Sequence, residues 1–274
     1  LLRWELERRK CDAKTVVKIE KPQAVANLEA IVAKADAVMI ARGDLGVEID
    51  VEKVPAVQKR IIGVCHRFRK PVITATQMLA SMETSNRPTR AEASDVFNAI
   101  LDGTDAVMLS GETAIGAYPV EAVATMSRIA SEAEALLRSL PYTPLPVADG
   151  HAHEEPVTES MVEAASVACR SLDAKLLIVA TFHGRSALAV SKQRQATPTL
   201  ALTTSPCAAQ IMTLYWGVTP VIVPEITGAV NALDTALAWA REHQIVTSGD
   251  HVALLVGTIP GVAVHNALLV EEVP

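Results

Sequence analysis

Short apolar runs alternate with longer amphipathic segments along the first half of the chain. Four of these runs have the length and apolar character of buried strands, and they lie at residues 15–20, 37–41, 71–77 and 106–112. After each run, apolar residues recur every three or four positions, which is typical of a helix with one buried face. Repeated strand–helix units predict parallel strands joined by right-handed crossovers.

A proline-rich stretch at residues 141–156 interrupts this alternation and predicts a boundary between two domains. We expect a first domain at 1–140, a linker at 141–156 and a second α/β domain at 157–274. The second domain is expected to begin with a helix that Thr158 caps. Its last two strands are too close in sequence for a crossover helix, so they are expected to be antiparallel neighbours. The expected strands lie at residues 176–181, 199–203, 218–223, 252–257 and 267–270.

Polar residues gather where the first two predicted strands end. Lys18 and Glu20 are two positions apart, so their side chains lean to the same side of the strand. Asp44 follows the second strand between Gly43 and Gly46, whose small size lets a ligand approach the backbone. Such strand ends carry the active sites of (β/α)8 barrels and doubly wound sheets. Carboxylates there predict a Mg²⁺ site and a lysine suits a transferring phosphoryl group, although spacing alone favours a surface salt bridge.

Composition narrows the class of protein. Half of the residues are hydrophobic and 3% are aromatic, which is typical of parallel α/β proteins whose strands are buried on both faces. The net charge of −6 and the lack of a Lys/Arg cluster argue against a nucleic acid partner, and no apolar run approaches the length of a membrane span. The four cysteines are scattered without a CxxC pair, which favours a reducing, cytoplasmic setting, and Cys65 and Cys169 are expected in the core.

Six short sequence words follow one another in the order and at the spacing of a known family. The segment from residue 18 to residue 122 resembles the second half of the catalytic barrel of pyruvate kinase. The later part of the chain resembles the C-terminal domain of the same family. The six words are 18–20 (KIE), 39–48 (MIARGDLGVE), 75–79 (ATQML), 87–92 (RPTRAE), 101–103 (LDG) and 108–114 (MLSGETA).

The resemblance implies a fold class: half of a (β/α)8 TIM barrel followed by a smaller α/β domain with a mostly parallel sheet. A complete barrel needs twice as many strand–helix units as this region holds, and Leu1 falls inside a predicted helix, so we expect the sequence to start partway through the barrel. The implied activity is that of a glycolytic kinase, which transfers the phosphoryl group of phosphoenolpyruvate to ADP and gives pyruvate and ATP. A cytoplasmic homotetramer is implied by resemblance alone, and the activity of this truncated chain by itself stays open.

By the same resemblance, Lys18 and Thr76 are the expected catalytic residues. Lys18 stabilises the transferring phosphoryl group, and Thr76 lies close to the substrate and helps to place the enolate and its proton. Glu20 and Asp44 hold the divalent cation, Mg²⁺ or Mn²⁺, while the backbone amides of Gly43 and Asp44 receive the substrate carboxylate. The family's K⁺ site lies outside this chain, as does much of its nucleotide site. Taken alone, Thr76 is an ordinary β-branched strand residue.

Other polar residues keep two interpretations. Arg90 and Glu92 fit the start of a helix with an acidic first turn, whereas the resemblance implies a place near the mouth of the active site and a subunit contact. Glu112 either supports the site from behind or caps a helix. His151 and His153 are spaced like metal ligands, but they lie in the linker without a third ligand, so we expect them to be solvated loop residues.

A loop in the second domain resembles the family's effector site for a sugar phosphate. It follows a predicted strand, precedes a predicted helix and offers hydroxyl, glycine and arginine groups to a phosphate. Phe182 and His183 stand where small hydroxyl residues or a lysine would make a richer cradle, so simple structural capping competes with effector binding. The residues of this effector-phosphate loop are Thr181, His183, Gly184, Arg185 and Ser186.

Two further functions compete with the kinase assignment. Mg²⁺-dependent aldolase or lyase barrels of the citrate-lyase-β type also bind their metal through a strand-end Glu and Asp, but they lack the ATQM and SGET words and the second domain. The chain could instead be a non-catalytic regulatory or assembly fragment, because four strands cannot close a barrel and leave open edges for pairing.

Overall fold

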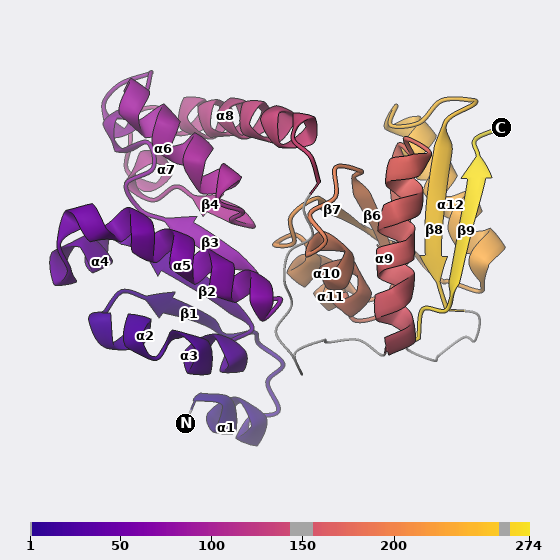
Figure 1. Cartoon of the computed structure of the whole chain (residues 1–274), viewed down its shortest axis with the longest axis horizontal. Coiled ribbons are helices and arrows are strands. Elements are labelled where there is room, and N and C mark those ends of the chain that lie inside the picture. Colours follow the sequence, from indigo (N-terminus) through magenta and orange to yellow (C-terminus); the bar gives the residue numbers. More distant parts are fainter. Residues whose placement is uncertain (1, 143–155, 258–263) are drawn as a thin grey trace. The chain divides into compact units, whose positions relative to one another are not determined.

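The computed structural model describes residues 2–142, 156–257 and 264–274. Its chain divides into two compact units, Leu1–Ala135 and Leu136–Pro274, each built around its own sheet (Figure 1). Apart from residues 141, 142 and 156, the predicted linker lies outside the described residues, and so do His151 and His153. None of the described helices combines the length and the apolar composition that crossing a membrane would take.

The first unit is built on a four-stranded sheet in which every strand is parallel to its neighbours. Strand order follows the sequence, so each crossover leads to the adjacent strand, as in half of a (β/α)8 barrel. The central strands are largely buried, whereas the two outer ones are more exposed. In spatial order the strands are β1 Val16–Ile19, β2 Ala37–Ala41, β3 Val72–Ala75 and β4 Ala106–Met108.

Helices connect these strands and supply one side of the core. Ile19 of β1 and Ile40 of β2 are fully buried and cluster with Val32, Ile61 and Cys65 from two helices, which confirms the predicted core position of this cysteine. Full burial of a side chain such as Ile40 contributes about 1.5–3 kcal/mol. The helices are α1 Leu2–Arg8, α2 Pro22–Ala26, α3 Leu28–Lys34, α4 Arg42–Glu48, α5 Val54–Arg67, α6 Arg90–Leu101, α7 Gly111–Ala114 and α8 Pro119–Ser139, with short 3-10 turns at η1 Val51–Lys53 and η2 Ala80–Glu83.

Two of the predicted strands extended at least two residues too far at their carboxyl ends. β3 stops at Ala75 because Thr76 and Gln77 leave the extended conformation, with φ angles of 68° and 52°. β4 stops at Met108, and the residues predicted to extend it form a turn and the short helix α7. In that turn Glu112 accepts hydrogen bonds from backbone amides, which takes the place of ladder pairing.

The second unit has a five-stranded sheet of order β7-β6-β5-β8-β9. Its first four strands are parallel, and β9 pairs antiparallel with β8, as the short connection between the last two strands predicted. The strand order reverses between β5 and β8, which makes their carboxyl ends a topological switch point. The elements are α9 Pro156–Ser171, β5 Leu176–Ala180, α10 Arg185–Ser191, β6 Thr199–Thr203, α11 Pro206–Met212, β7 Val218–Ile222, α12 Ala229–Glu242, β8 His251–Val256 and β9 Ala267–Glu272.

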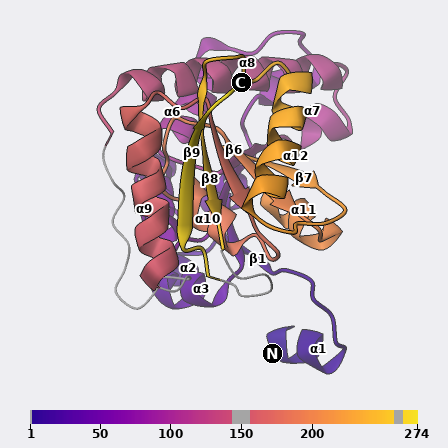
Figure 2. The same ribbon diagram turned by 90° about the vertical axis from the view of Figure 1, so that its right-hand side faces the viewer.

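Helices cover both faces of this second sheet. Successive residues of β5 alternate between two cores: Ile178 belongs to the cluster that includes α12, and Val179 belongs to the cluster that includes α9. Figure 2 shows α9 and α12 on opposite sides of the strands. Cys169 of α9 is buried, as predicted. Coverage on both faces explains why β5 and β6 read as unbroken apolar runs rather than as alternating ones.

The N-cap predicted at Thr158 is wrong. Helix α9 already begins at Pro156, whose ring presets the helical φ angle at the first position. Thr158 therefore lies inside the first turn and is fully buried. Its hydroxyl accepts a hydrogen bond from the backbone amide of His265 at 2.9 Å, so this side chain ties the helix to the segment that leads into β9.

Candidate functional site

Lys18, Glu20 and Asp44 come together at the carboxyl ends of β1 and β2. The Lys18 Nζ atom lies 2.7 Å from Glu20 Oε2 and 3.3 Å from Asp44 Oδ2. The hydrogen bond to Glu20, and then that to Asp44, raises the pKa of Lys18. The lysine and aspartate side chains are 50% and 61% exposed, and exposed ion pairs contribute little to stability. The cluster therefore leaves its charges accessible to a ligand.

The donor set of this cluster fits a hard divalent cation. Mg²⁺ is commonly bound by one or two carboxylates and fills its other positions with water and substrate oxygens. Glu20 Oε2 is buried and faces the Lys18 ammonium at 2.7 Å, so a cation bound to this oxygen would replace or share that contact. Within the described ranges no group of three or more His, Cys, Asp and Glu side chains could hold a metal.

Thr76 joins the end of β3 to the start of α4. The backbone amide of Gly43 donates to Thr76 Oγ1 at 2.8 Å, and the Thr76 hydroxyl donates to the carbonyl oxygen of Ala75 at 2.7 Å. A Cβ atom on Gly43 would lie 3.3 Å from Thr76 Oγ1, which is tighter than ordinary contact, so the glycine permits this approach. The structure thus brings the predicted residues Gly43, Asp44 and Thr76 to one edge of the sheet.

The backbone is strained at this edge. Thr76 and Gln77 both have positive φ angles, a conformation that is rare for residues other than glycine and rarer still for a β-branched residue. Each such residue costs about 1–3 kcal/mol and persists only when its surroundings hold it. Strain of this kind clusters at functional sites, and it could not be predicted here because neither residue is glycine or asparagine.

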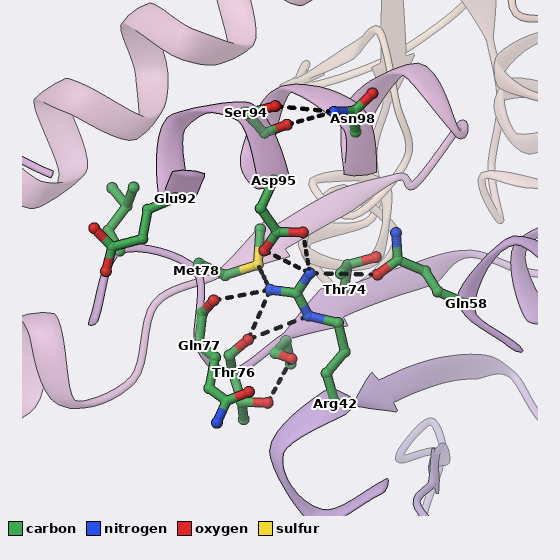
Figure 3. A network of polar contacts seen from close by, with 12 residues as sticks. Arg42, Gln58, Thr74, Thr76, Gln77, Met78, Glu92, Ser94, Asp95 and Asn98 are labelled. Carbon is green, nitrogen blue, oxygen red and sulfur yellow. Dashed lines mark hydrogen bonds and ion pairs between the residues drawn. The ribbon is translucent and has the colours of Figure 1, made fainter. Parts of the chain in front are cut away.

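Arg42 donates hydrogen bonds to this strained segment, and its contacts were not predicted from the sequence. Its guanidinium is buried and donates through Nη2 to the carbonyl oxygens of Thr76 at 2.9 Å and Gln77 at 3.1 Å (Figure 3). Its Nη1 atom donates to Asp95 Oδ1 of α6 at 2.7 Å and contacts Gln58 Oε1 of α5 at 3.4 Å. A charged residue directly after a fully apolar strand was the one available signal.

Glu92 completes the start of helix α6. Thr89 caps the helix by accepting from the Glu92 amide, and the Glu92 carboxylate accepts from the Thr89 amide, which makes a capping box. The same carboxylate accepts from the Ser81 amide at 2.7 Å and from its hydroxyl at 2.5 Å. The helix-start interpretation of Arg90 and Glu92 is therefore confirmed, and the subunit contact stays a prediction.

Glu112 links the segments that follow β3 and β4. Its carboxylate is buried and accepts from the Leu79 amide at 3.0 Å and from the Ser110 amide at 2.7 Å. The second bond is made at the start of α7, and the first reaches the loop behind Thr76. The bond to Ser110 fits the capping interpretation of Glu112, and its support of the site stays a prediction.

The loop of residues 181–186 in the second unit lies at the switch point after β5. Thr181 Oγ1 accepts from the Gly184 amide at 3.2 Å, and Gly184 has the left-handed φ of 78° that favours glycine. Ser186 Oγ lies 3.1 Å from His265 Nδ1, whose Nε2 lies 2.6 Å from the carbonyl oxygen of Ala180. Burial lowers the pKa of His265 and outweighs the hydrogen bond to that carbonyl. The contact of His265 with this loop could not be predicted from the sequence, because the two are 79 residues apart.

The fold and the first site together define the class of protein: a parallel α/β unit of the barrel type that presents a lysine and two carboxylates at its strand ends. The family models "Pyruvate kinase, barrel domain" and "Pyruvate kinase, alpha/beta domain" match residues 2–123 and 159–270. The chain therefore belongs to the pyruvate kinase family. This membership sets aside the aldolase or lyase alternative.

Individual relatives agree with the family match. The chain is 43% identical over 258 residues to pyruvate kinase 2 of Synechocystis sp. and 42% identical over 257 residues to the pyruvate kinase of Clostridium acetobutylicum. A crystal structure of a pyruvate kinase from Cryptosporidium parvum covers 96% of this chain with a TM-score of 0.85 and 37% identity. These matches include 42% and 54% of the two relatives and 52% of the crystallised chain, so the present chain spans about half their length.

Proposed function

We propose that this chain carries the metal- and phosphoenolpyruvate-binding part of a pyruvate kinase. The reaction is phosphoryl transfer from phosphoenolpyruvate to ADP, which gives pyruvate and ATP in glycolysis. The observation that carries the proposal is that Lys18 Nζ lies within 3.3 Å of the carboxylates of both Glu20 and Asp44 at the strand ends. The contact between Thr76 and Gly43 lies at the same edge of the sheet. Family membership supports the same reaction.

Each residue of the site has a part in this reaction. Lys18 stabilises the transferring phosphoryl group, whose transition state needs positioning and positive charge rather than covalent help. Glu20 and Asp44 hold Mg²⁺ or Mn²⁺, which when bound neutralises phosphoryl and enolate oxygens. The Gly43 and Asp44 amides receive the substrate carboxylate.

Thr76 is proposed as the residue that orients the enolate for protonation on carbon. Its hydroxyl accepts from the Gly43 amide and donates to Ala75, so it has to exchange partners when a substrate carboxylate arrives at that amide. The strained backbone would hold the Thr76 hydroxyl in a fixed position. A fixed position matters because a small displacement of a positioned catalytic group lowers the reaction rate.

The wider context of the enzyme follows from the family. We propose a cytoplasmic homotetramer that also uses K⁺, with the K⁺ ligands outside this chain. For the effector-phosphate loop, the switch point after β5 is where doubly wound sheets bind ligands, which favours a sugar-phosphate effector at Thr181, His183, Gly184, Arg185 and Ser186. The internal bonds of Thr181 and Ser186 favour structural capping instead, so the two uses of this loop stay in competition.

The test uses the whole chain and the variant Asp44→Asn. Pyruvate formation from phosphoenolpyruvate and ADP with Mg²⁺ is measured, and Mn²⁺ binding is followed by electron paramagnetic resonance. Asp44→Asn is expected to abolish turnover and to weaken Mn²⁺ binding, whereas the exposed control Asp12→Asn should change neither. Failure of the unaltered chain to bind Mn²⁺ would overturn the proposal. Binding without turnover would favour the non-catalytic fragment.

A further inference from the structure

The backbone after β3 can hold its conformation only with outside help. Thr76 and Gln77 are consecutive residues with φ angles of 68° and 52°, and neither is a glycine. Relaxation of Thr76 to an ordinary extended conformation would turn its hydroxyl away from the Gly43 amide. The hydrogen bond between the Gly43 amide and the Thr76 hydroxyl, which the proposed function needs, therefore depends on the groups that stabilise the peptides of Thr76 and Gln77.

We propose that Arg42, oriented by Asp95, is a positioning residue that holds Thr76 and Gln77 in this conformation. The inference rests on the proposed function for its catalytic meaning, but its geometry stands apart from it. The planar guanidinium donates to both carbonyl oxygens, at 2.9 and 3.1 Å, and its Nε atom is 3.3 Å from the oxygen of Thr76. A fork of fixed donors can clamp two adjacent carbonyls in a way that a lysine ammonium cannot.

Arg42 and Gly43 act on Thr76 as a pair. They are successive residues at the start of α4, and one holds the carbonyl oxygen of Thr76 while the other holds its hydroxyl oxygen. Two contacts from one rigid turn fix both the peptide plane and the side chain of Thr76. Arg42 reaches no part of the Lys18 cluster in the contacts of the described chain, so it acts on the site through Thr76.

Asp95 makes the clamp rigid. Its carboxylate approaches Arg42 Nη1 at 2.7 Å with both oxygens, and it is carried by α6, a helix whose start is fixed by the capping box of Thr89 and Glu92. The arginine side chain is 8% exposed and that of Asp95 is 41% exposed, so the pair lies at the border of the core. Gln58 on α5 adds a weaker contact at 3.4 Å. Three elements thus converge on one guanidinium, as Figure 3 shows.

The first test is independent of turnover. Amide hydrogen exchange at Gly43 reports its bond to Thr76, and we expect Arg42→Lys to lower the protection of that amide by about tenfold or more. Asp95→Asn leaves the arginine in place but removes the charge that orients it, so a smaller loss is expected. Arg67→Lys, which alters a half-buried arginine of α5 that pairs with Glu29 of α3, is the matched control and should leave Gly43 unchanged.

The second test shows whether the clamp acts through Thr76. In the active protein, Arg42→Lys should lower kcat by about 10- to 100-fold with less change in KM. In a Thr76→Val background the same change should cost less than about twofold, since residues that act as a unit are not additive. A merely structural role of Arg42 would give equal losses in both backgrounds.

The outcomes separate this inference from the proposed function. Unchanged Gly43 protection in both Arg42→Lys and Asp95→Asn overturns the clamp, whatever the turnover. Lost protection together with a kcat effect that vanishes in the Thr76→Val background supports it fully. If the unaltered chain does not bind Mn²⁺, the proposed function has failed and hydrogen exchange alone decides the clamp. Asp95→Asn keeps the test open if Arg42→Lys does not fold.

Discussion

The Lys18 cluster of the first unit lies open to solvent, whereas in the strand-end loop of the second unit Thr181 and Ser186 are buried and His183 and Arg185 are exposed. Lys18 and Asp44 are half or more exposed and are joined by one ion pair. Thr181, Ser186 and His265 are all less than 10% exposed, and each is bonded to another part of the second unit. Lys18 and Asp44 can therefore form further contacts with a ligand. The hydrogen-bonding groups of Thr181, Ser186 and His265 are mostly occupied by bonds within the fold.

This difference shows how to judge which of two similarly placed loops in one chain is better suited to bind a ligand. Both loops stand at the carboxyl ends of parallel strands, which is where such sheets bind ligands. What separates them is whether a ligand would add hydrogen bonds or would have to replace existing ones. Replacement of a buried internal bond costs about 1–3 kcal/mol before the ligand gains anything. The site around Lys18 is therefore the stronger ligand site, and the loop around Ser186 is the stronger structural device.

The largest effect is expected for Lys18→Met. Loss of the ammonium should lower turnover by about 10³-fold, since a single electrostatic group in a transition-state site is worth this much. Mn²⁺ binding should persist or tighten, because the ammonium no longer competes for Glu20 and Asp44. Pyruvate formation and paramagnetic resonance titration measure the two effects.

The control for this change is Lys53→Met. Lys53 is an exposed lysine that pairs with Asp50 at 2.6 Å in the same unit. It should leave turnover and metal binding unaltered. If Lys18→Met abolishes Mn²⁺ binding, the ammonium organises the two carboxylates instead of facing the substrate. The view that the Lys18 cluster has free contacts for a ligand would then be wrong.

A smaller effect is expected from pH on the second unit. Because burial lowers the pKa of His265 in the folded state, the unfolded chain binds the proton more readily. The stability that this group contributes is present above the unfolded pKa of about 6.5 and is lost as pH falls below it. The melting temperature of the second unit should drop on acidification, by about 4 °C for each kcal/mol lost. Fluorescence of Trp216 and Trp239, which both lie in this unit, follows the transition.

Substitution of the histidine sharpens this prediction. His265→Gln keeps an amide that can donate to the carbonyl oxygen of Ala180 but does not titrate, so the pH slope should flatten between pH 7 and pH 5. His243→Gln alters the exposed histidine that follows α12 in the same unit and should retain the slope. A slope that survives in His265→Gln assigns the pH dependence to another group and weakens the view of this loop as a structural device.

The pattern of apolar residues along the sequence predicted the sheets well, because it depends directly on which residues are buried. An unbroken apolar run such as residues 37–41 has to be covered on both faces, and β2 Ala37–Ala41 matches it residue for residue. The cluster of Lys18, Glu20 and Asp44 was also within reach, since strand ends of a parallel sheet meet at one edge. Their roles in the reaction stay predictions.

The groups that sequence reasoning missed are joined across long stretches of chain. Arg42 meets Asp95 and His265 meets Ser186 over separations of 53 and 79 residues, and neither pair has a spacing that a local pattern could reveal. The positive φ angle of Thr76 was equally hidden, because it is imposed by Arg42 and not by the residue itself. Tertiary contacts decide these features, so they become visible only in the folded chain.

The smallest effect is expected for Glu92, a group of the first unit that is satisfied as fully as the buried loop of the second. Burial raises its pKa, but hydrogen bonds from Ser81 and Thr89 outweigh this and lower it overall. Its contribution to stability is therefore present above the unfolded pKa of about 4.3 and is lost as pH falls through the lower folded value. Glu92→Gln should cost about 1 kcal/mol or less at neutral pH and should reduce the acid sensitivity of helix α6, measured by hydrogen exchange of its amides.

The matched control for this change is Glu121→Gln, at an exposed glutamate in the first turn of another helix, α8. It should leave the acid sensitivity of α6 as it is. Turnover should fall by less than about threefold in Glu92→Gln, because the carboxylate acts on the helix that carries Asp95 and not on the substrate. A larger loss of turnover with intact helix stability would show that Glu92 acts in the active site and not only in the structure of α6. It would also show that a fully hydrogen-bonded group can still take part in catalysis.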